Sequence, residues 1–235
     1  MKTLAIDASG MTASVAIVDE EHTLGEISTH FKKNHAETLM PMISQLTELL
    51  GINLCEMDFI SCAAGPGSFT GLRIGAATAK AIAYAHSVPI APVPTLDALA
   101  YNALARDGLI IPLMDARRNQ VYTAFYKWRD EAAPVRITGE CAVGIEEALK
   151  RAAGYDGGAF FIGDGAQAYS EIIIRSGLGA LAPSYIKQRA SAVGAVGIVM
   201  AKNGSTVTSG AFVPYYLRKP QAEREREERM AARGE

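Results

Sequence analysis

Two hydrophobic patterns alternate along the first half of the chain. Residues 3–7 and 13–19 are short apolar segments with a small polar stretch between them, which predicts two strands around a turn. A third strand is expected over 23–31. The apolar positions of residues 35–50 recur at intervals of three and four, so we expect an amphipathic helix that ends at Gly51.

A continuous apolar run, residues 58–64, leads directly into a glycine-rich turn. Such a run is typical of a strand buried on both faces. After the turn, residues 69–86 are rich in Ala and favour a helix, and residues 88–93 return to a strand pattern. Strand, helix and strand in this order form a β-α-β unit, so part of the sheet should be parallel.

The second half of the chain repeats this order. Residues 109–116 are apolar and end in Asp115-Ala116, as the first strand ends in Asp7-Ala8. The elements expected after it are strands over 121–128 and 135–141, a helix over 145–153, a strand over 159–162, a glycine turn, and a helix to about residue 176. This duplication predicts two similar α/β lobes facing each other across a cleft; one larger α/β sheet is the alternative.

The predicted lobes comprise residues 1–105 and 106–220, with the boundary in the segment 104–108. Residues 221–235 form a tail in which charges of both signs are interleaved and little can be buried. A solvated terminal helix and a partner-docking tail would both have this composition.

Composition narrows the functional classes. The chain has 235 residues, 49% of them hydrophobic, and a net charge of −2, which is ordinary for a folded protein but unsuited to a free-standing nucleic-acid binder. No segment has a signal-peptide pattern or the ~18 uninterrupted apolar residues of a membrane span, so we expect a cytoplasmic protein. The three cysteines and four histidines lack the spacing of a metal site, and no catalytic triad can be argued from spacing.

The strongest local motif is GPGSFTGLRIG, residues 65–75. Its glycines permit close backbone approach, and Ser68 or Thr70 can cap the following helix, whose first N–H groups would suit an anion. The motif matches neither a P-loop nor the dinucleotide fingerprint. Anion binding and a purely structural tight turn therefore both remain open.

Two carboxylates stand at equivalent strand ends. Asp7 and Asp115 would face the cleft, where a carboxylate can orient magnesium-bound water, act as a base, or simply cap the next turn. Arg117 and Arg118 are placed for anion or partner contacts. The candidate anion or nucleotide cleft comprises Asp7, Ser9, Gly67, Ser68, Asp115, Arg117, Arg118, Gly163 and Gly165.

Several segments together resemble the bacterial TsaB (YeaZ) family. They are LAIDAS, NHAETLMP, GPGSFTGLRIG, MDARRNQVY and the late YYLR followed by QAERE, and they run from about residue 4 to residue 225. The resemblance implies a two-lobed fold of the actin, sugar-kinase and Hsp70 clan, in agreement with the duplication.

The resemblance also implies a function. TsaB proteins are similar to their partner TsaD, which transfers threonylcarbamoyl to adenosine 37 of tRNAs that read ANN codons. The positions of the two metal-binding histidines of TsaD fall here at Thr95 and Leu99, and neither side chain replaces an imidazole. We therefore expect a non-catalytic subunit that binds and activates TsaD. It should hold no metal or cofactor of its own, with metal and ATP or ADP bound by partner subunits.

The resemblance places the contact with TsaD on the first two helices, residues 35–50 and 69–86. The TsaE ATPase would complete a ternary complex, tRNA would be bound only through the complex, and the isolated chain should form a homodimer. A small-residue face of the second helix is suited to a partner helix, although it could instead pack on its own sheet. The predicted interface comprises His35, Leu39, Met42, Phe69, Arg73, Ala76, Ala79, Lys80, Ala83 and Tyr84.

Two other functions remain as alternatives. A small-molecule kinase or ATPase of the actin clan would use the cleft between the lobes and bind Mg-ATP. A metallopeptidase is less favoured, because the sequence offers neither a metal pair nor an activated nucleophile.

Overall fold

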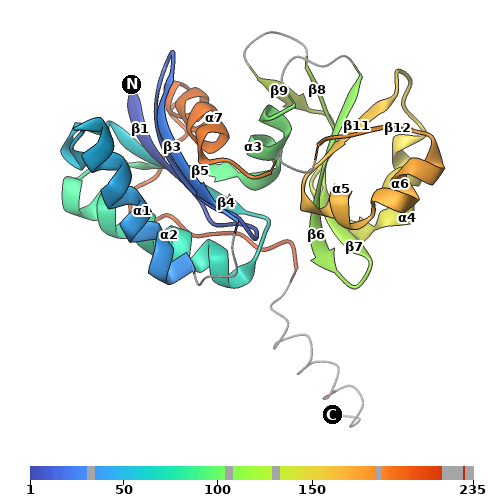
Figure 1. Ribbon diagram of the computed structural model, residues 1–235, viewed down its shortest axis with the longest axis horizontal. Helices are drawn as coiled ribbons and strands as arrows, with labels where there is room; N and C mark the ends of the chain where they lie inside the picture. Colours follow the sequence, from blue (N-terminus) through green and yellow to red (C-terminus); the bar gives the residue numbers. More distant parts are fainter. Residues whose placement is uncertain (31–34, 104–107, 129–132, 184–186, 219–229, 231–235) are drawn as a thin grey trace.

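The chain folds into two α/β lobes that lie side by side (Figure 1). The computed structural model describes residues 1–30, 35–103, 108–128, 133–183, 187–218 and 230. The predicted boundary at residues 105 and 106, and all but one residue of the predicted tail 221–235, lie outside these ranges. In the described part of the chain, no helix combines the length and the apolar character that crossing a bilayer requires.

Lobe I is built on a five-stranded sheet in the order β3-β2-β1-β4-β5. Its strands are β1 (Lys2–Asp7), β2 (Ala13–Asp19), β3 (Thr23–Thr29), β4 (Phe59–Gly65) and β5 (Ile90–Pro94). The first three strands pair antiparallel, and β4 and β5 continue the sheet in parallel. The antiparallel start and the parallel β-α-β unit expected from the sequence are therefore both confirmed.

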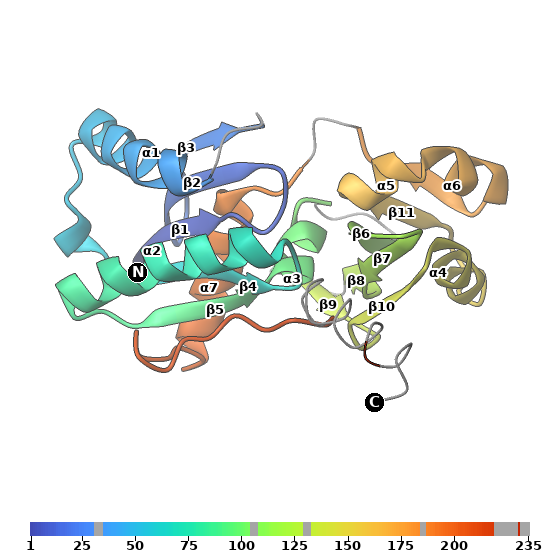
Figure 2. The ribbon, with the colours of Figure 1, turned by 90° about the horizontal axis from the view of Figure 1, so that it is seen from below.

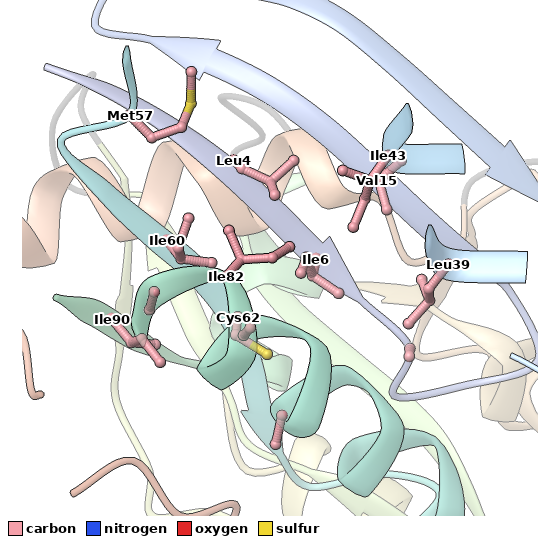
Figure 3. Close-up of a cluster of buried hydrophobic side chains, with 14 of the residues drawn as sticks. Leu4, Ile6, Val15, Leu39, Ile43, Met57, Ile60, Cys62, Ile82 and Ile90 are labelled. Atoms are coloured by element: carbon pink, nitrogen blue, oxygen red, sulfur yellow. The ribbon is translucent and has the colours of Figure 1, made fainter. Parts of the chain in front are cut away.

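Helices cover both faces of this sheet. One face carries α1 (His35–Leu50), the short 3-10 helix η1 (Leu54–Glu56) and α2 (Phe69–His86), and the other carries α3 (Thr95–Tyr101) and α7 (Ala190–Lys202). Between α1, α2 and the sheet lies a dry cluster that includes Leu4, Ile60 and Ile82 (Figure 3). The strands are apolar on both sides because both sides are buried.

Lobe II repeats the strand order of lobe I. Its main path is β10-β7-β6-β11-β12, with β8 paired to β6 and β9 to β8. The elements are β6 (Leu109–Arg117), β7 (Gln120–Thr123), β8 (Tyr126–Trp128), β9 (Pro134–Arg136), β10 (Cys141–Gly144), α4 (Ile145–Ala152), β11 (Ala159–Ile162), α5 (Asp164–Ala168), α6 (Ser170–Ser176) and β12 (Gly179–Leu181). In both lobes two antiparallel partners precede two parallel ones, so the duplication is confirmed and the single larger sheet is wrong.

Two strands predicted as continuous in lobe II are interrupted. The stretch 121–128 divides into β7 and β8, and the stretch 135–141 divides into β9 and β10. The side chain of Phe125 is buried, its amide donates a hydrogen bond to the hydroxyl oxygen of Thr138 at 2.8 Å, and its carbonyl accepts one from the amide of Ile137 at 2.7 Å. These bonds bend both segments at the same point. The helix expected to follow Gly163 is likewise divided, into α5 and α6, at Tyr169.

The assignment of residues 106–220 to the second lobe is corrected by α7. This helix packs against β1, β2, β4 and β5 of lobe I, and the following segment pairs with β5 through the bridge between Ile90 and Val207. Two glycines explain the close packing. A Cβ at Gly194 would lie 2.6 Å from the Val18 side chain, and one at Gly197 would lie 2.1 Å from the Ser61 hydroxyl.

The first test of the fold concerns the start of α2. A Cβ at Gly71 would lie 2.0 Å from the carbonyl oxygen of Ala8, so Gly71→Ala must force the two backbones apart. We expect this variant to lose about 1–3 kcal/mol of unfolding free energy, the usual range for overpacking. The control is Gly139→Ala, because a Cβ at Gly139 meets nothing within 4 Å. Urea unfolding of both variants measures the difference, and equal stabilities would contradict this account of the turn.

Candidate functional site

A cleft of about 690 Å³ separates the two lobes. Lobe I contributes the turn after β1 and the start of α2, while lobe II contributes the end of β6 and the start of α5. The C-terminal segment supplies the remaining wall. The lining residues are Ser9, Gly10, Met11, Gly67, Ser68, Phe69, Met114, Asp115, Ala116, Arg117, Tyr122, Asp164, Ala168, Tyr216, Leu217 and Arg218.

Asp7 does not line this cleft. Its side chain is 1% exposed, and its Oδ1 accepts hydrogen bonds from the amide of Ser9 at 2.9 Å and from the hydroxyl of Ser9 at 2.6 Å. Burial raises the pKa of the Asp7 carboxyl, and the two bonds from Ser9 oppose that shift. The carboxylate therefore caps the turn after β1, which is one of the three roles that the sequence analysis left open for Asp7.

The glycine-rich loop lies directly on that turn. A Cβ at Gly67 would lie 2.4 Å from the carbonyl oxygen of Ser9, and the amide of Ser68 donates to the same oxygen at 2.7 Å. The Ser68 hydroxyl caps α2 by accepting from the amide of Gly71 at 3.3 Å. Close backbone contact within the lobe thus accounts for Gly67 and Gly71 without an anion, although Gly67 and Ser68 do line the cleft.

On the opposite wall, Asp115 and Asp164 are the two carboxylates of the cleft. Asp115 accepts from the amide of Arg117 at 2.8 Å, and the Arg117 guanidinium lies 3.8 Å from the second oxygen of Asp115. Asp164 accepts from the amides of Asp115 at 3.2 Å and Gly165 at 2.9 Å, and burial raises its pKa.

The predicted cleft residues therefore divide into two groups. Ser9, Gly67, Ser68, Asp115 and Arg117 line the cleft, whereas Asp7, Arg118, Gly163 and Gly165 do not. Gly163 and Gly165 are needed because each passes close to the backbone of Leu113. Sequence reasoning missed Asp164, Tyr216 and Arg218. Asp164 lies between Gly163 and Gly165, two residues after the end of β11, so the predicted glycine turn pointed to it, but no local pattern indicates that the segment 216–218 returns to the cleft.

The predicted partner interface on α1 and α2 needs a larger correction. Five of its residues lie in the core of lobe I, each 5% exposed or less: Leu39, Met42, Ala76, Ala79 and Ala83. The small-residue face of α2 therefore packs on its own sheet. Of the remaining five, Arg73 and Tyr84 are exposed, and His35, Phe69 and Lys80 are half-buried.

A second small-residue face of α2 does reach the surface. Ala77 and Ala81 are exposed and lie on one helical face with Arg73 and Tyr84, whose side chain is 81% exposed. The neighbouring α1 exposes Met40 and Leu49, the latter at 77%. The helix α2 therefore does expose a small-residue face, but this face is made of Ala77 and Ala81 and not of the alanines that the sequence analysis named.

The positions that the resemblance equates with metal-binding histidines lie on α3. Thr95 and Leu99 are 0% and 1% exposed, inside the packed interior. Among the residues that the structure describes, no group of three or more His, Cys, Asp or Glu side chains is placed to hold a metal ion.

The repeated strand order, the cleft between the lobes and the helices on both faces of the first sheet define a two-lobed α/β protein with an internal duplication. A family model described as TsaD, tRNA N6-adenosine threonylcarbamoyltransferase, matches residues 20–226. Comparison with known proteins narrows the class further. The chain belongs to the TsaB (YeaZ) family.

Three relatives support this assignment. TsaB of Haemophilus influenzae is 30% identical over 185 residues, which cover 72% of this chain and 74% of that protein. TsaB of Bacillus subtilis is 41% identical over 130 residues, but the match covers 55% of this chain and only 57% of that protein. The solved structure of YeaZ from Pseudomonas aeruginosa superposes with a TM-score of 0.76 at 25% identity, covering 92% of this chain and 99% of that one.

The role of Asp7 predicts a pH dependence of stability. Above the ordinary pKa of 3.8, the buried carboxyl keeps a proton that the unfolded chain has already lost, so the native protein loses stability as the pH rises through this window. Asp7→Asn keeps an oxygen that accepts from Ser9 and removes this cost. We therefore expect the unfolding free energy of the variant, relative to the parent, to rise between about pH 4 and about pH 7.

The control is Asp19→Asn. Amide donors from Glu21 and His22 lower the pKa of Asp19, so the parent gains stability from this group above its ordinary pKa and loses it as the pH falls. Because this pH dependence lies below about pH 4, the stability of the variant relative to the parent should stay nearly constant between about pH 4 and about pH 7. Urea unfolding at both pH values measures the two variants, and an equal rise in both would contradict the assignment.

Proposed function

We propose that this chain is a non-catalytic subunit in the formation of threonylcarbamoyladenosine in tRNA, and that it binds and activates the transferase TsaD. The observation that carries the proposal is the similarity to proteins named tRNA threonylcarbamoyladenosine biosynthesis protein TsaB, one of which aligns over 93% of this chain. The modified nucleoside would be adenosine 37 of tRNAs that read ANN codons.

The interior of the chain supports the non-catalytic role. Thr95 and Leu99, which the resemblance equates with the metal-binding histidines of TsaD, are both buried, and Leu99 lies in an apolar cluster. Neither a threonine hydroxyl at a sealed position nor a leucine side chain supplies a metal ligand. On this proposal, the metal and ATP or ADP belong to TsaD and to the TsaE ATPase of a ternary complex, and tRNA is bound only through that complex, in the cytoplasm.

The surface of α2 supports the partner role. Ala77 and Ala81 allow a helix to approach closely, and Tyr84 supplies exposed apolar area on the same helical face. Small residues that permit close approach, beside a larger exposed side chain, are suited to helix-on-helix packing. When TsaD is absent, the same surface would pair with a second copy of this chain.

The proposal is tested by reconstitution. Purified chain is mixed with threonylcarbamoyl-AMP and unmodified tRNA, with and without TsaD, and the nucleosides of the digested tRNA are measured. We expect no threonylcarbamoyladenosine from the chain alone and more product with TsaD plus the chain than with TsaD alone. Product from the chain alone, or no effect on TsaD, would overturn the proposal.

The same preparation tests the alternative that the cleft serves a kinase or ATPase. The observation in its favour is that Asp115 and Asp164 face the cleft from one wall. Titration with Mg-ATP by calorimetry separates the two functions, because binding by the isolated chain is expected only for the alternative.

The interface is tested by arginine substitutions on the exposed face of α2. Ala77→Arg and Ala81→Arg place a long charged side chain where a partner helix would pack, and we expect association with TsaD to weaken at least tenfold without loss of thermal stability. Ala153→Arg, at an exposed position after α4 in lobe II, is the control for an added charge. Ala79→Arg, in contrast, should unfold lobe I, because Ala79 is fully buried. Unchanged binding by both surface variants would show that TsaD contacts another face.

A further inference from the structure

The short helix α3 belongs to the packing of both lobes. Ala98 joins the cluster between α7 and the sheet of lobe I. Leu96, Leu99 and Ala100 join a second cluster with residues of lobe II, among them Ile110, Met114, Tyr126, Phe160 and Ile162. An apolar contact thus runs from one lobe through α3 into the other, and opening it would expose buried side chains to water.

A network of polar side chains lies beside this contact. Asp97 of α3 accepts a hydrogen bond from the Tyr126 hydroxyl at 2.6 Å and one from Nε of Arg136 at 3.0 Å. Arg136 also pairs with Glu140 at 3.0 Å, and Glu140 accepts from the Tyr215 hydroxyl at 2.8 Å. The Glu140 side chain is only 9% exposed, whereas those of Asp97 and Arg136 are 28% and 31% exposed, so the bonds of Glu140 are the better shielded from water.

Tyr215 brings the network back to lobe I. Its amide donates to the carbonyl of Ala64, at the end of β4, at 2.9 Å. The hydrogen bonds therefore pass from α3 to two strands and a loop of lobe II and return to lobe I through the C-terminal segment. The two ends of the network, Asp97 and Tyr215, are therefore attached to lobe I, and the residues between them belong to lobe II.

The segment 203–218, which we name the strap, follows lobe I and then crosses to lobe II (Figure 2). On lobe I, Phe212 is buried in the core and its carbonyl accepts from the Lys80 ammonium at 3.1 Å, while the Tyr216 ring packs at a tilt of 42° against Phe69 with ring centroids 4.7 Å apart. On lobe II, the Arg218 guanidinium donates to the carbonyl of Ala116 at 2.7 Å.

We propose that the strap and the network from Asp97 to Tyr215 lock the two lobes at one fixed angle, so that the chain presents a preformed, rigid surface instead of closing on a ligand. The lock adds to the apolar contact through α3, which lies beside the network and shares Tyr126 with it. Breaking the polar network alone should therefore loosen the angle without separating the lobes.

The test measures the distance between the lobes directly. Spin labels are placed at Glu21→Cys in lobe I and at Glu171→Cys in lobe II, both exposed positions, in a background of Cys55→Ser and Cys141→Ala, and the distance distribution is measured by pulsed electron resonance. The parent should give one narrow distribution. Tyr215→Phe, alone and together with Glu140→Gln, should broaden it toward longer distances.

Two further variants keep the test decisive. Tyr169→Phe is the matched control, because it removes a tyrosine hydroxyl from a carboxylate, Asp115, within lobe II alone, and it should leave the distribution unchanged. Arg218→Met interrupts the strap at a second point and should also broaden the distribution. It therefore tests the proposal even if the double variant of Tyr215 and Glu140 fails to fold. A broad distribution in the parent would overturn the proposal. So would Tyr215→Phe and Arg218→Met variants that melt at lower temperature but keep the narrow distribution, since the network would then only add stability.

Discussion

The close contact between two backbone segments at the start of α2 fixes the position of this helix and of one wall of the cleft. The turn after β1 and the glycine-rich loop after β4 meet so closely that Gly67 and Gly71 have no room for a side chain beyond a hydrogen atom. This contact sets where α2 begins, and the start of a helix sets the direction of every later side chain. The buried side of α2, its exposed side and one wall of the cleft all follow from it. Asp7 stabilises the same turn, because its carboxylate accepts two hydrogen bonds from Ser9. For this reason the carboxylate does not face the cleft.

Most of the fold could be predicted from the sequence, because its regular parts are long and periodic. β2, α1, α2 and β11 begin and end at the expected residues, and the two halves share one strand order. The errors occur where tertiary contacts override local pattern. Phe125 interrupts two strands through bonds to Thr138 and Ile137, and α7 returns to lobe I although the whole of lobe II lies between it and α3. Neither contact leaves a local signal.

The candidate site was less predictable than the fold for a related reason. A stripe of alanines on a helix predicts close packing, but it does not indicate whether the helix packs on its own sheet or on a partner protein. Ala76, Ala79 and Ala83 pack on their own sheet, while Ala77 and Ala81, one position further along, are exposed. Glycines and strand-end carboxylates are equally ambiguous, because a tight turn within the lobe and an anion site require the same residue types. Only the distances to Ala8, Ser9 and Leu113 distinguish these readings.

The return of α7 to the first sheet also has a consequence for how the protein forms. Lobe I is discontinuous in sequence, since α7, which covers its second face together with α3, and the buried Phe212 come after the whole of lobe II. During synthesis this face of the sheet is therefore covered only by the short α3 until α7 leaves the ribosome, whereas every strand of lobe II lies in one uninterrupted stretch. The lobe that is made first is thus the lobe that is completed last.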